Sequence, residues 1–276
     1  MATVYPPDRH LLRDLRLSFE HGGDRTSRAW MPVAPELFAT DGAVRAGALA
    51  TLVDVIGGGL AAAAAHPGWI ATADLTLHLV RAATAGSVQA RARVVHSGRT
   101  TVVIEVGLFG DADVELGIAT MSFAVLPRRD GNPDISTGMA AGPSTMALES
   151  SRMHAPLLDE LGVHTLDAER GELEVPVSDW SRNSFGAMQG GAVATIVDAA
   201  AEAVAQAATG VALTVTDIQL TYLALARVGP LRTRVDVLGV GPGAVTARVE
   251  LVDTGADARV TTVGRVVATS TLRGSR

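Results

Sequence analysis

The chain has 276 residues, enough for one large domain or two of ordinary size, and its hydrophobic content of 47% supports a substantial core. Its formal net charge of −6, without any run of basic residues, argues against nucleic acid and anionic membranes as main partners. The chain has no cysteine, which excludes disulfides, thiolate catalysis and cysteine-based zinc sites.

The N-terminal residues contain no apolar segment of the signal-peptide type. The longest apolar run, residues 55–65, is rich in glycine and alanine and falls far short of the roughly 20 residues that a membrane span needs. We therefore expect a cytoplasmic protein that does not enter a membrane.

An internal repeat organises the chain. The sequence GALATLVD at 47–54 recurs 144 residues later as GAVATIVD at 191–198, with six of the eight positions identical. After one deletion the alignment of the two copies continues through later glycines; for example, Gly98 aligns with Gly241. A chance similarity of two alanine-rich helices would not extend the alignment so far, so the sequence indicates a duplication.

The same elements follow one another in both copies. Two strand-like runs around a glycine-containing turn come first, at 15–33 and 162–177. A glycine-containing loop then leads to one helix of about 16 to 20 residues that is apolar on most sides. Three or four strands complete each copy, at 71–82, 86–98, 100–111 and 115–126 in the first and at 213–224, 229–241, 244–255 and 258–270 in the second.

A helix that is apolar on most sides must be enclosed by the rest of the fold. Each copy therefore predicts a curled antiparallel sheet of about five strands around one central helix, which is an α+β arrangement. We assign residues 1–126 to the first repeat and 152–276 to the second. Residues 127–151, rich in Gly, Pro and Ser, are typical of a linker.

One sequence motif stands before the second helix only. Residues 183–191 read NSFGAMQGG, and Asp198 follows seven residues after the last glycine. The motif resembles the signature of PaaI-type acyl-CoA thioesterases, N-x-x-G-x-x-H-G-G followed by Asp, with Gln189 where that family has His. The order of elements resembles the hot-dog fold of the same family. The chain as a whole thus resembles a tandem, or double, hot-dog protein.

The resemblance implies roles for these residues. The Gly190 N–H would bind the thioester carbonyl, which suits the unpaired N–H groups and partial positive charge of a helix N-terminus. Asn183 would help to orient the reaction, and an Asp would act as nucleophile or general base, with a Ser or Thr from the next strand. Gly190 and Gly191 would let an acyl-pantetheine chain lie against the backbone. No metal or cofactor is expected, since coenzyme A enters as part of the substrate.

The acid must come from the other repeat. Asp198 lies about eight residues beyond Gly190, or roughly 12 Å along a helix, too far to reach a carbonyl held there. One composite site would therefore join Asn183, Gln189 and Gly190 to Asp54, with Thr72 on the next strand. We expect the side chain of Thr72 to share a face with that of Asp74, because strand residues alternate.

The second composite site would join the first helix entrance and Gly47 to Asp198, beside Gly191. At the positions of the signature it has Ala39 for Asn, Arg45 for Gln and Ala46 for the first Gly, and Val215 stands where the other site has Thr72. All losses fall on this site, so we expect the first composite site to be catalytic and the second to be degenerate.

Each of these residues also has a plain structural interpretation. Asp54 and Asp198 could cap a neighbouring turn, although an Asp in an apolar helix is costly unless paired. Asn183 could cap the loop amides, Gln189 could shape the loop, and Thr72 could be an ordinary strand residue. Glu202 is expected at an interface or facing solvent, with a lesser role as a substitute acid.

Hydrolysis of an acyl-CoA or acyl-carrier thioester is the function that these features favour. A binding or sensing module without turnover is the alternative, and Gln189 in place of His favours it. A hydratase of the hot-dog type is less favoured, because Gly59 and Ala203 stand where a His would follow the Asp by five residues. The acyl group is left open, and association of chains into a homo-oligomer is compatible with the fold.

Overall fold

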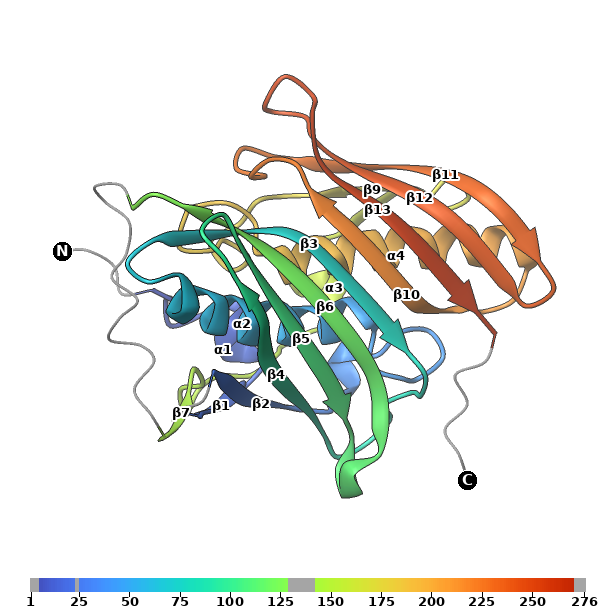
Figure 1. Ribbon diagram of the computed structural model, residues 1–276. Coiled ribbons are helices and arrows are strands. Elements are labelled where there is room, and N and C mark those ends of the chain that lie inside the picture. The colour runs from blue at the N-terminus through green and yellow to red at the C-terminus, as the bar shows by residue number, and fades with distance from the viewer. Residues whose placement is uncertain (1–4, 23–24, 129–141, 271–276) are drawn as a thin grey trace.

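The structure is a computed structural model that describes residues 5–22, 25–128 and 142–270. It forms one curved antiparallel sheet of 13 strands around two long helices (Figure 1). The elements before the second repeat are α1 (Leu11–Asp14), β1 (Ser18–His21), β2 (Thr26–Pro32), α2 (Ala46–Ala65), β3 (Trp69–Leu79), β4 (Ser87–Ser97), β5 (Thr101–Phe109), β6 (Glu115–Leu126) and β7 (Gly142–Thr145). Those of the second repeat are α3 (Leu157–Glu160), β8 (His164–Asp167), β9 (Glu172–Val175), α4 (Gly190–Thr209), β10 (Thr214–Tyr222), β11 (Leu231–Gly241), β12 (Ala244–Asp253) and β13 (Arg259–Thr269).

The two central helices are enclosed as their composition predicts. Each is 20 residues long and is followed by four strands, β3 to β6 in the first repeat and β10 to β13 in the second. By length and composition both helices could cross a membrane, but 67% of the apolar window of α2 and 78% of that of α4 are buried in the fold. Their apolar surface therefore forms the core of this protein.

The two repeats share one sheet. Its strand order is β7-β1-β2-β4-β5-β6-β3-β10-β13-β12-β11-β9-β8, and β3 pairs antiparallel with β10, placing Leu75 opposite Leu220. The sequence predicted about five strands around each helix and left open how the two sheets meet. The β3–β10 pairing joins them edge to edge, which leaves no free sheet edge at the centre of the molecule.

The helices α2 and α4 contact each other at their first turns through glycine. A Cβ built on Gly47 would lie 2.3 Å from the Cα of Thr195, and one built on Gly191 would lie 2.3 Å from the Cα of Thr51. The hydroxyls of Thr51 and Thr195 each donate to a carbonyl of their own helix, at 3.0 Å. Gly191 thus allows close helix packing, and the space beside it that we expected for an acyl-pantetheine chain is filled by Thr51.

We expect Gly191→Ala to lower the free energy of unfolding by about 1 to 3 kcal/mol. The new methyl group would clash with the backbone of the facing helix, and the two helices would have to move apart to accommodate it. Gly239→Ala is the matched control, since nothing lies within 4 Å of a Cβ at Gly239. Its effect should stay within about 0.5 kcal/mol. Urea unfolding curves of the two variants give the comparison, and equal losses would contradict the close helix contact.

Segments outside the two repeat cores tie the halves together. Residues 142–145 of the expected linker form β7, which pairs with β1, while 129–141 lie outside the described residues. The helix α1 of the first repeat docks on the second repeat: the Leu11 N–H donates to the Trp180 carbonyl at 2.9 Å, and the Trp180 indole donates to Asp14 at 2.8 Å. The N-terminal residues therefore help to place the chain that leads into α4.

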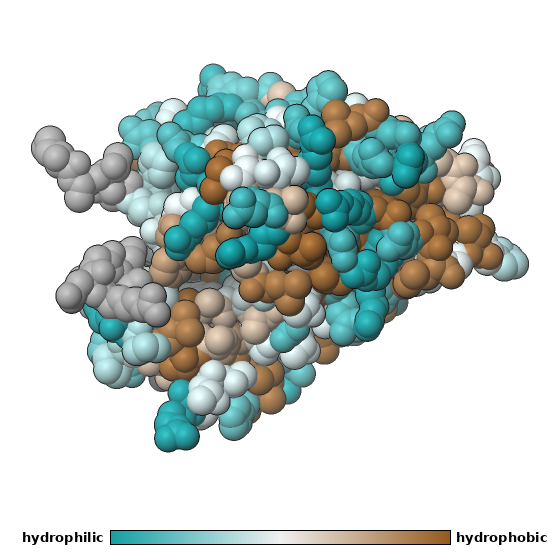
Figure 2. Space-filling view, turned by 90° about the horizontal axis from the view of Figure 1, so that it is seen from above, coloured by the Kyte–Doolittle hydropathy of each residue, from teal (hydrophilic) through white to brown (hydrophobic). Residues whose placement is uncertain are grey.

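Apolar side chains also reach the surface. Seen from above, they form a band across the molecule between polar groups (Figure 2). The exposed large hydrophobic residues include Leu223, Leu225 and Val228 on the loop after β10. Association of chains stays a prediction.

Candidate active site

Asp54 lies on α2 with 6% of its surface exposed, beside the first turn of α4. Its carboxylate accepts a hydrogen bond from Thr72 Oγ1 at 3.2 Å and one from Gln189 Nε2 at 3.3 Å. The backbone N–H of Gly191 also donates to it. The structure therefore brings the acid of the first repeat together with the helix entrance of the second, as the spacing of Asp198 and Gly190 led us to expect.

The environment of Asp54 favours a carboxyl group that titrates near neutrality. Burial raises the pKa of Asp54 to about 6, and the hydrogen bonds from Thr72 and Gly191 lower it by less than burial raises it. A carboxylate with such a pKa is ionised at neutral pH and is still basic enough to take a proton.

Gly190 faces the same carboxylate. A Cβ at this position would lie 2.8 Å from Oδ2 of Asp54, so a side chain would displace the acid. Gly190 is the first residue of α4, and its N–H makes no hydrogen bond within the described ranges. This N–H therefore offers a free donor, at the positive end of a helix, beside a buried base.

Asn183 shapes the loop and does not reach Asp54. Its side-chain oxygen accepts from the N–H of Phe185 at 2.9 Å and from the N–H of Ala187 at 3.1 Å. The structural interpretation of this residue, a cap for the loop amides, is therefore confirmed, while its action on a substrate stays a prediction.

Thr72 and Asp74 do not share a face, contrary to our expectation. The register of β3 against β6 shifts between them, so the strand alternation is interrupted by a bulge. Thr72 reaches Asp54 on the helix side, whereas the Asp74 carboxylate is exposed and accepts from Ser122 and Thr221. The bulge turns the Thr72 hydroxyl toward the helix, where it contacts the acid.

The second composite site, around Asp198, holds a buried ion cluster that the first site lacks in the described part of the chain. The Gly47 N–H donates to Asp198 Oδ2 at 3.0 Å, which repeats the contact between Gly191 and Asp54. Arg45, the counterpart of Gln189, donates to Asp198 at 3.4 Å and to Glu202 at 2.8 Å. All three ionic side chains are buried. Glu202 therefore lies inside the molecule, not facing solvent.

This buried cluster satisfies its own polar groups. The Glu202 carboxylate also accepts from the N–H of Thr40 at 3.1 Å and from its hydroxyl at 2.6 Å. Burial raises the pKa of Asp198, and the Arg45 guanidinium opposes part of that rise. Arg45, which directly precedes α2, therefore holds Asp198 in a buried ion pair.

The aromatic residues that lie around the loop and first turn of α4 were not predicted from the sequence. Tyr222 donates through its hydroxyl to the Gly190 carbonyl at 2.9 Å, and Trp69 packs edge-on against Phe185 with ring centroids 5.0 Å apart. The charge of Asp54 acts on the phenols of Tyr5 and Tyr222, the only two tyrosines of the chain. Comparison of the copies could have found Tyr222, because its counterpart is Leu79.

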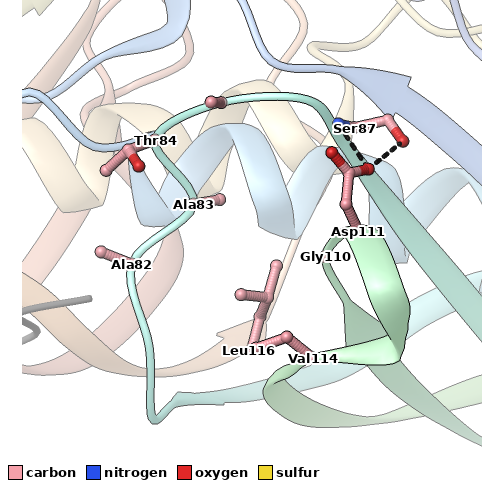
Figure 3. Close-up of a pocket in the computed structure, with 9 residues that line it drawn as sticks. Ala82, Ala83, Thr84, Ser87, Gly110, Asp111, Val114 and Leu116 are labelled. Atoms are coloured by element: carbon pink, nitrogen blue, oxygen red, sulfur yellow. Dashed lines mark hydrogen bonds between the residues drawn. The ribbon is translucent and has the colours of Figure 1, made fainter. Parts of the chain in front are cut away.

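A separate small pocket lies in the first repeat (Figure 3). Its volume is about 160 Å³, and it is lined by the loop after β3 and the turn between β5 and β6. Ser87 donates to Asp111 at its rim through both its N–H and its hydroxyl, at 3.3 Å each. None of the predicted site residues lines this pocket. Within the described ranges, no group of three or more His, Asp or Glu side chains is placed to hold a metal ion.

Solved structures with the same architecture define the class of fold. A protein from Thermobifida fusca assigned as a thioesterase II aligns over 91% of this chain and 94% of its own, with 19% identity and a TM-score of 0.59. An acyl-ACP thioesterase from Bacteroides thetaiotaomicron aligns over 88% and 98%, with 12% identity and a TM-score of 0.58. A protein from Lactobacillus plantarum assigned as an oleoyl thioesterase aligns over 90% and 97%, with 8% identity and a TM-score of 0.62. The fold is the tandem hot-dog predicted from the sequence.

The family follows from the sequence itself. The model of the thioesterase superfamily matches residues 41–116 and 185–258, one segment in each repeat and more than half of the chain together. The chain therefore belongs to the thioesterase superfamily, and the resemblance to hot-dog thioesterases is confirmed. Among curated proteins, no sequence matches it.

Proposed function

We propose that this protein hydrolyses an acyl thioester of coenzyme A or of an acyl carrier at one composite site, formed by Asp54 and the first turn of α4. The observation that carries the proposal is the buried Asp54 carboxylate, with a pKa of about 6, directly beside the free N–H of Gly190. A base and an oxyanion donor thus stand together at the positive end of a helix.

The reaction uses few groups. The thioester carbonyl accepts the Gly190 N–H, and Asp54 takes a proton from a water molecule as the water oxygen bonds to the carbonyl carbon. The tetrahedral intermediate then expels the thiolate, the carbon–sulfur bond breaks, and the proton held by Asp54 passes to the sulfur. In the other variant of this chemistry, the carboxylate itself attacks the carbonyl carbon, the carbon–sulfur bond breaks as the thiolate leaves, and water then hydrolyses the mixed anhydride to the acid and free Asp54. Either route needs Asp54 ionised.

The neighbours of Asp54 position it. Thr72 and Gln189 each donate to one of its oxygens and fix the plane of the carboxylate. Asn183 holds the loop that ends at Gly190 through its two backbone contacts. Gln189 cannot exchange a proton as His does, so in this proposal it orients the acid and takes no part in proton transfer.

Only the composite site with Asp54 is proposed to catalyse hydrolysis. Asp198 is paired with Arg45, and Ala46 places a methyl group where Gly190 has none. The Arg45 guanidinium fills the position that a substrate carbonyl would need. Asp198, Gly47 and Gly191 therefore act in this proposal as structural groups at the helix contact.

The pH dependence of the rate should follow the ionisation of Asp54. We expect kcat/KM to be constant above about pH 7 and to fall tenfold per unit well below pH 6, since only the ionised form acts as base or nucleophile. Steady-state rates between pH 4.5 and 8.5 give the midpoint. A kcat/KM that stays constant down to pH 4.5 would mean a pKa near the ordinary Asp value of 3.8 and would contradict the buried base.

Thiol release from a panel of acyl-CoA and acyl-carrier thioesters tests the proposed activity. Short, long and aromatic acyl groups belong in the panel, because the site residues around Asp54 select no particular acyl group. Release above the background of Asp54→Asn is the expected result. Binding of the same thioesters without thiol release would instead favour the binding module, for which the observation is Gln189 in place of the family's His. We place the activity in the cytoplasm.

A further inference from the structure

Tyr222 contacts the peptide group that also contacts Asp54. It is the last residue of β10, and its hydroxyl donates to the carbonyl oxygen of Gly190 at 2.9 Å. The N–H of the same peptide unit belongs to Gly191 and donates to the Asp54 carboxylate. One peptide group is therefore held at both ends, by a phenol on its oxygen and by the acid on its nitrogen.

The first repeat lacks this contact. The counterpart of Tyr222 is Leu79, at the end of β3, and a leucine cannot donate to the Ala46 carbonyl. The Gly47 N–H nevertheless donates to Asp198 at 3.0 Å, so the helix contact itself does not need the phenol. The phenol thus accompanies Asp54, the acid that is free of an arginine.

A hydrogen bond to a peptide oxygen polarises the peptide and makes its N–H a stronger donor. A stronger N–H donor stabilises the charged form of the carboxylate that accepts it. We propose that Tyr222 is a positioning residue of the composite site, which acts through the Gly190–Gly191 peptide to stabilise the ionised Asp54. The inference rests on the proposed function only in taking Asp54 as the working acid.

The other neighbours of Asp54 are neutral, so a change in its pKa on substitution of Tyr222 can be assigned to the lost hydroxyl. Thr72 and Gln189 are neutral donors to its two oxygens. Tyr5 and Tyr222 are the titratable groups on which its charge acts. Desolvation and the Asp54 charge raise the pKa of both phenols, although Tyr5 keeps 40% of its surface exposed, so both stay protonated. The phenol of Tyr222 is therefore a neutral donor over the whole range in which Asp54 titrates.

Tyr222→Phe in the full chain removes the hydroxyl and keeps the ring. Carbon-13 NMR of labelled Asp carboxyl groups follows Asp54 directly, with its signal assigned from Asp54→Asn. We expect the pKa of Asp54 to rise by about 0.2 to 0.6 unit. The reason is that the polarisation by Tyr222 supplies roughly a tenth to a third of the strength of the charged hydrogen bond from the Gly191 N–H, and this part is lost. Asp198, at the other helix contact, is the internal reference and should not move.

A second variant changes the donor in the opposite direction without removing it. In the Tyr5→Phe background, Tyr222 is the only tyrosine. Incorporation of 3-fluorotyrosine there makes the phenol more acidic and a stronger donor. The pKa of Asp54 should then fall relative to the same background with ordinary tyrosine. Tyr5→Phe alone should leave the Asp54 titration unchanged, since Tyr5 makes no hydrogen bond to this peptide in the described structure.

Three results would overturn the role of Tyr222: an unchanged Asp54 titration in both variants, equal shifts at Asp54 and Asp198, or shifts of the same sign with phenylalanine and fluorotyrosine. If Tyr222→Phe does not fold, the fluorotyrosine arm decides alone. A protein that releases no thiol, yet shows the two opposite shifts, would overturn the proposed function and keep the inference. In an active protein, the acid limb of kcat/KM should move with the carboxyl titration.

Discussion

Asp54→Asn is expected to lower kcat/KM for thioester hydrolysis by at least about a hundredfold, the contribution of a general base or nucleophile. Asp198→Asn should leave it within a factor of about three. The two residues occupy matching positions in matching helices, so they form a matched pair of variants. Only Asp54 is free of an arginine, and only Asp54 lies beside a glycine N–H without a partner in the described chain. Initial rates with the best thioester of the panel give the comparison.

The stability of Asp54→Asn separates lost chemistry from lost folding. A carboxyl group whose pKa is raised on folding stabilises the native state below its unfolded value of 3.8, and this contribution is lost as the pH rises through about 6. At pH 8 the buried, ionised Asp54 thus destabilises the native state, and its replacement by Asn should not lower the melting temperature. Equal loss of activity in both Asn variants would mean that the choice of Asp54 over Asp198 is wrong.

Arg45→Gln is expected to destabilise the protein by about 3 to 5 kcal/mol at pH 8, because it leaves two buried carboxylates without their cation. The replacement is the residue found at the matching position of the other repeat, Gln189, so the side chain is one that this loop accommodates. Urea unfolding at pH 8 measures the effect. The loss should shrink below pH 6, since protonation removes the repulsion between Asp198 and Glu202.

Arg93→Gln is the matched control for Arg45→Gln. Arg93 pairs with Glu105 on the surface, with 59% of its side chain exposed, so its loss should cost less than about 1 kcal/mol. A loss at Arg45 no larger than that at Arg93 would contradict the buried ion cluster as the reason why the second arrangement is closed. It would also leave Asp198 free to act.

Comparison of the two copies within the sequence was enough to group the candidate site. The missing Asn, Gln and Gly of the first copy identified Gln189 and Gly190 as one half, and the length of one helix identified Asp54 as the other. The structure places these groups in contact. A helix has a fixed rise per residue, so the spacing of Gly190 and Asp198 alone shows that the acid comes from the other repeat.

Features that depend on contacts between the copies were not predictable in this way. The β3–β10 pairing leaves no signal in strand alternation, and the bulge between Thr72 and Asp74 interrupts that alternation locally. Of the two positions expected for Glu202, the interfacial one is confirmed and the solvent-facing one is wrong, and its partner Arg45, 157 residues away in the chain, was not predicted. The contact of Tyr222 with Gly190 lies within the second copy: comparison with Leu79 marks the position, but only the fold shows what the phenol contacts.

The number of ligand molecules bound per chain tests most directly the claim that one of two composite arrangements is a working site. Isothermal titration calorimetry with a non-hydrolysable thioether analogue of the best substrate measures it, with Arg45→Gln as a comparison. We predict one ligand per chain for the native protein. Two ligands per chain, bound with similar affinity, would show that Arg45 does not close the second arrangement and would contradict the account.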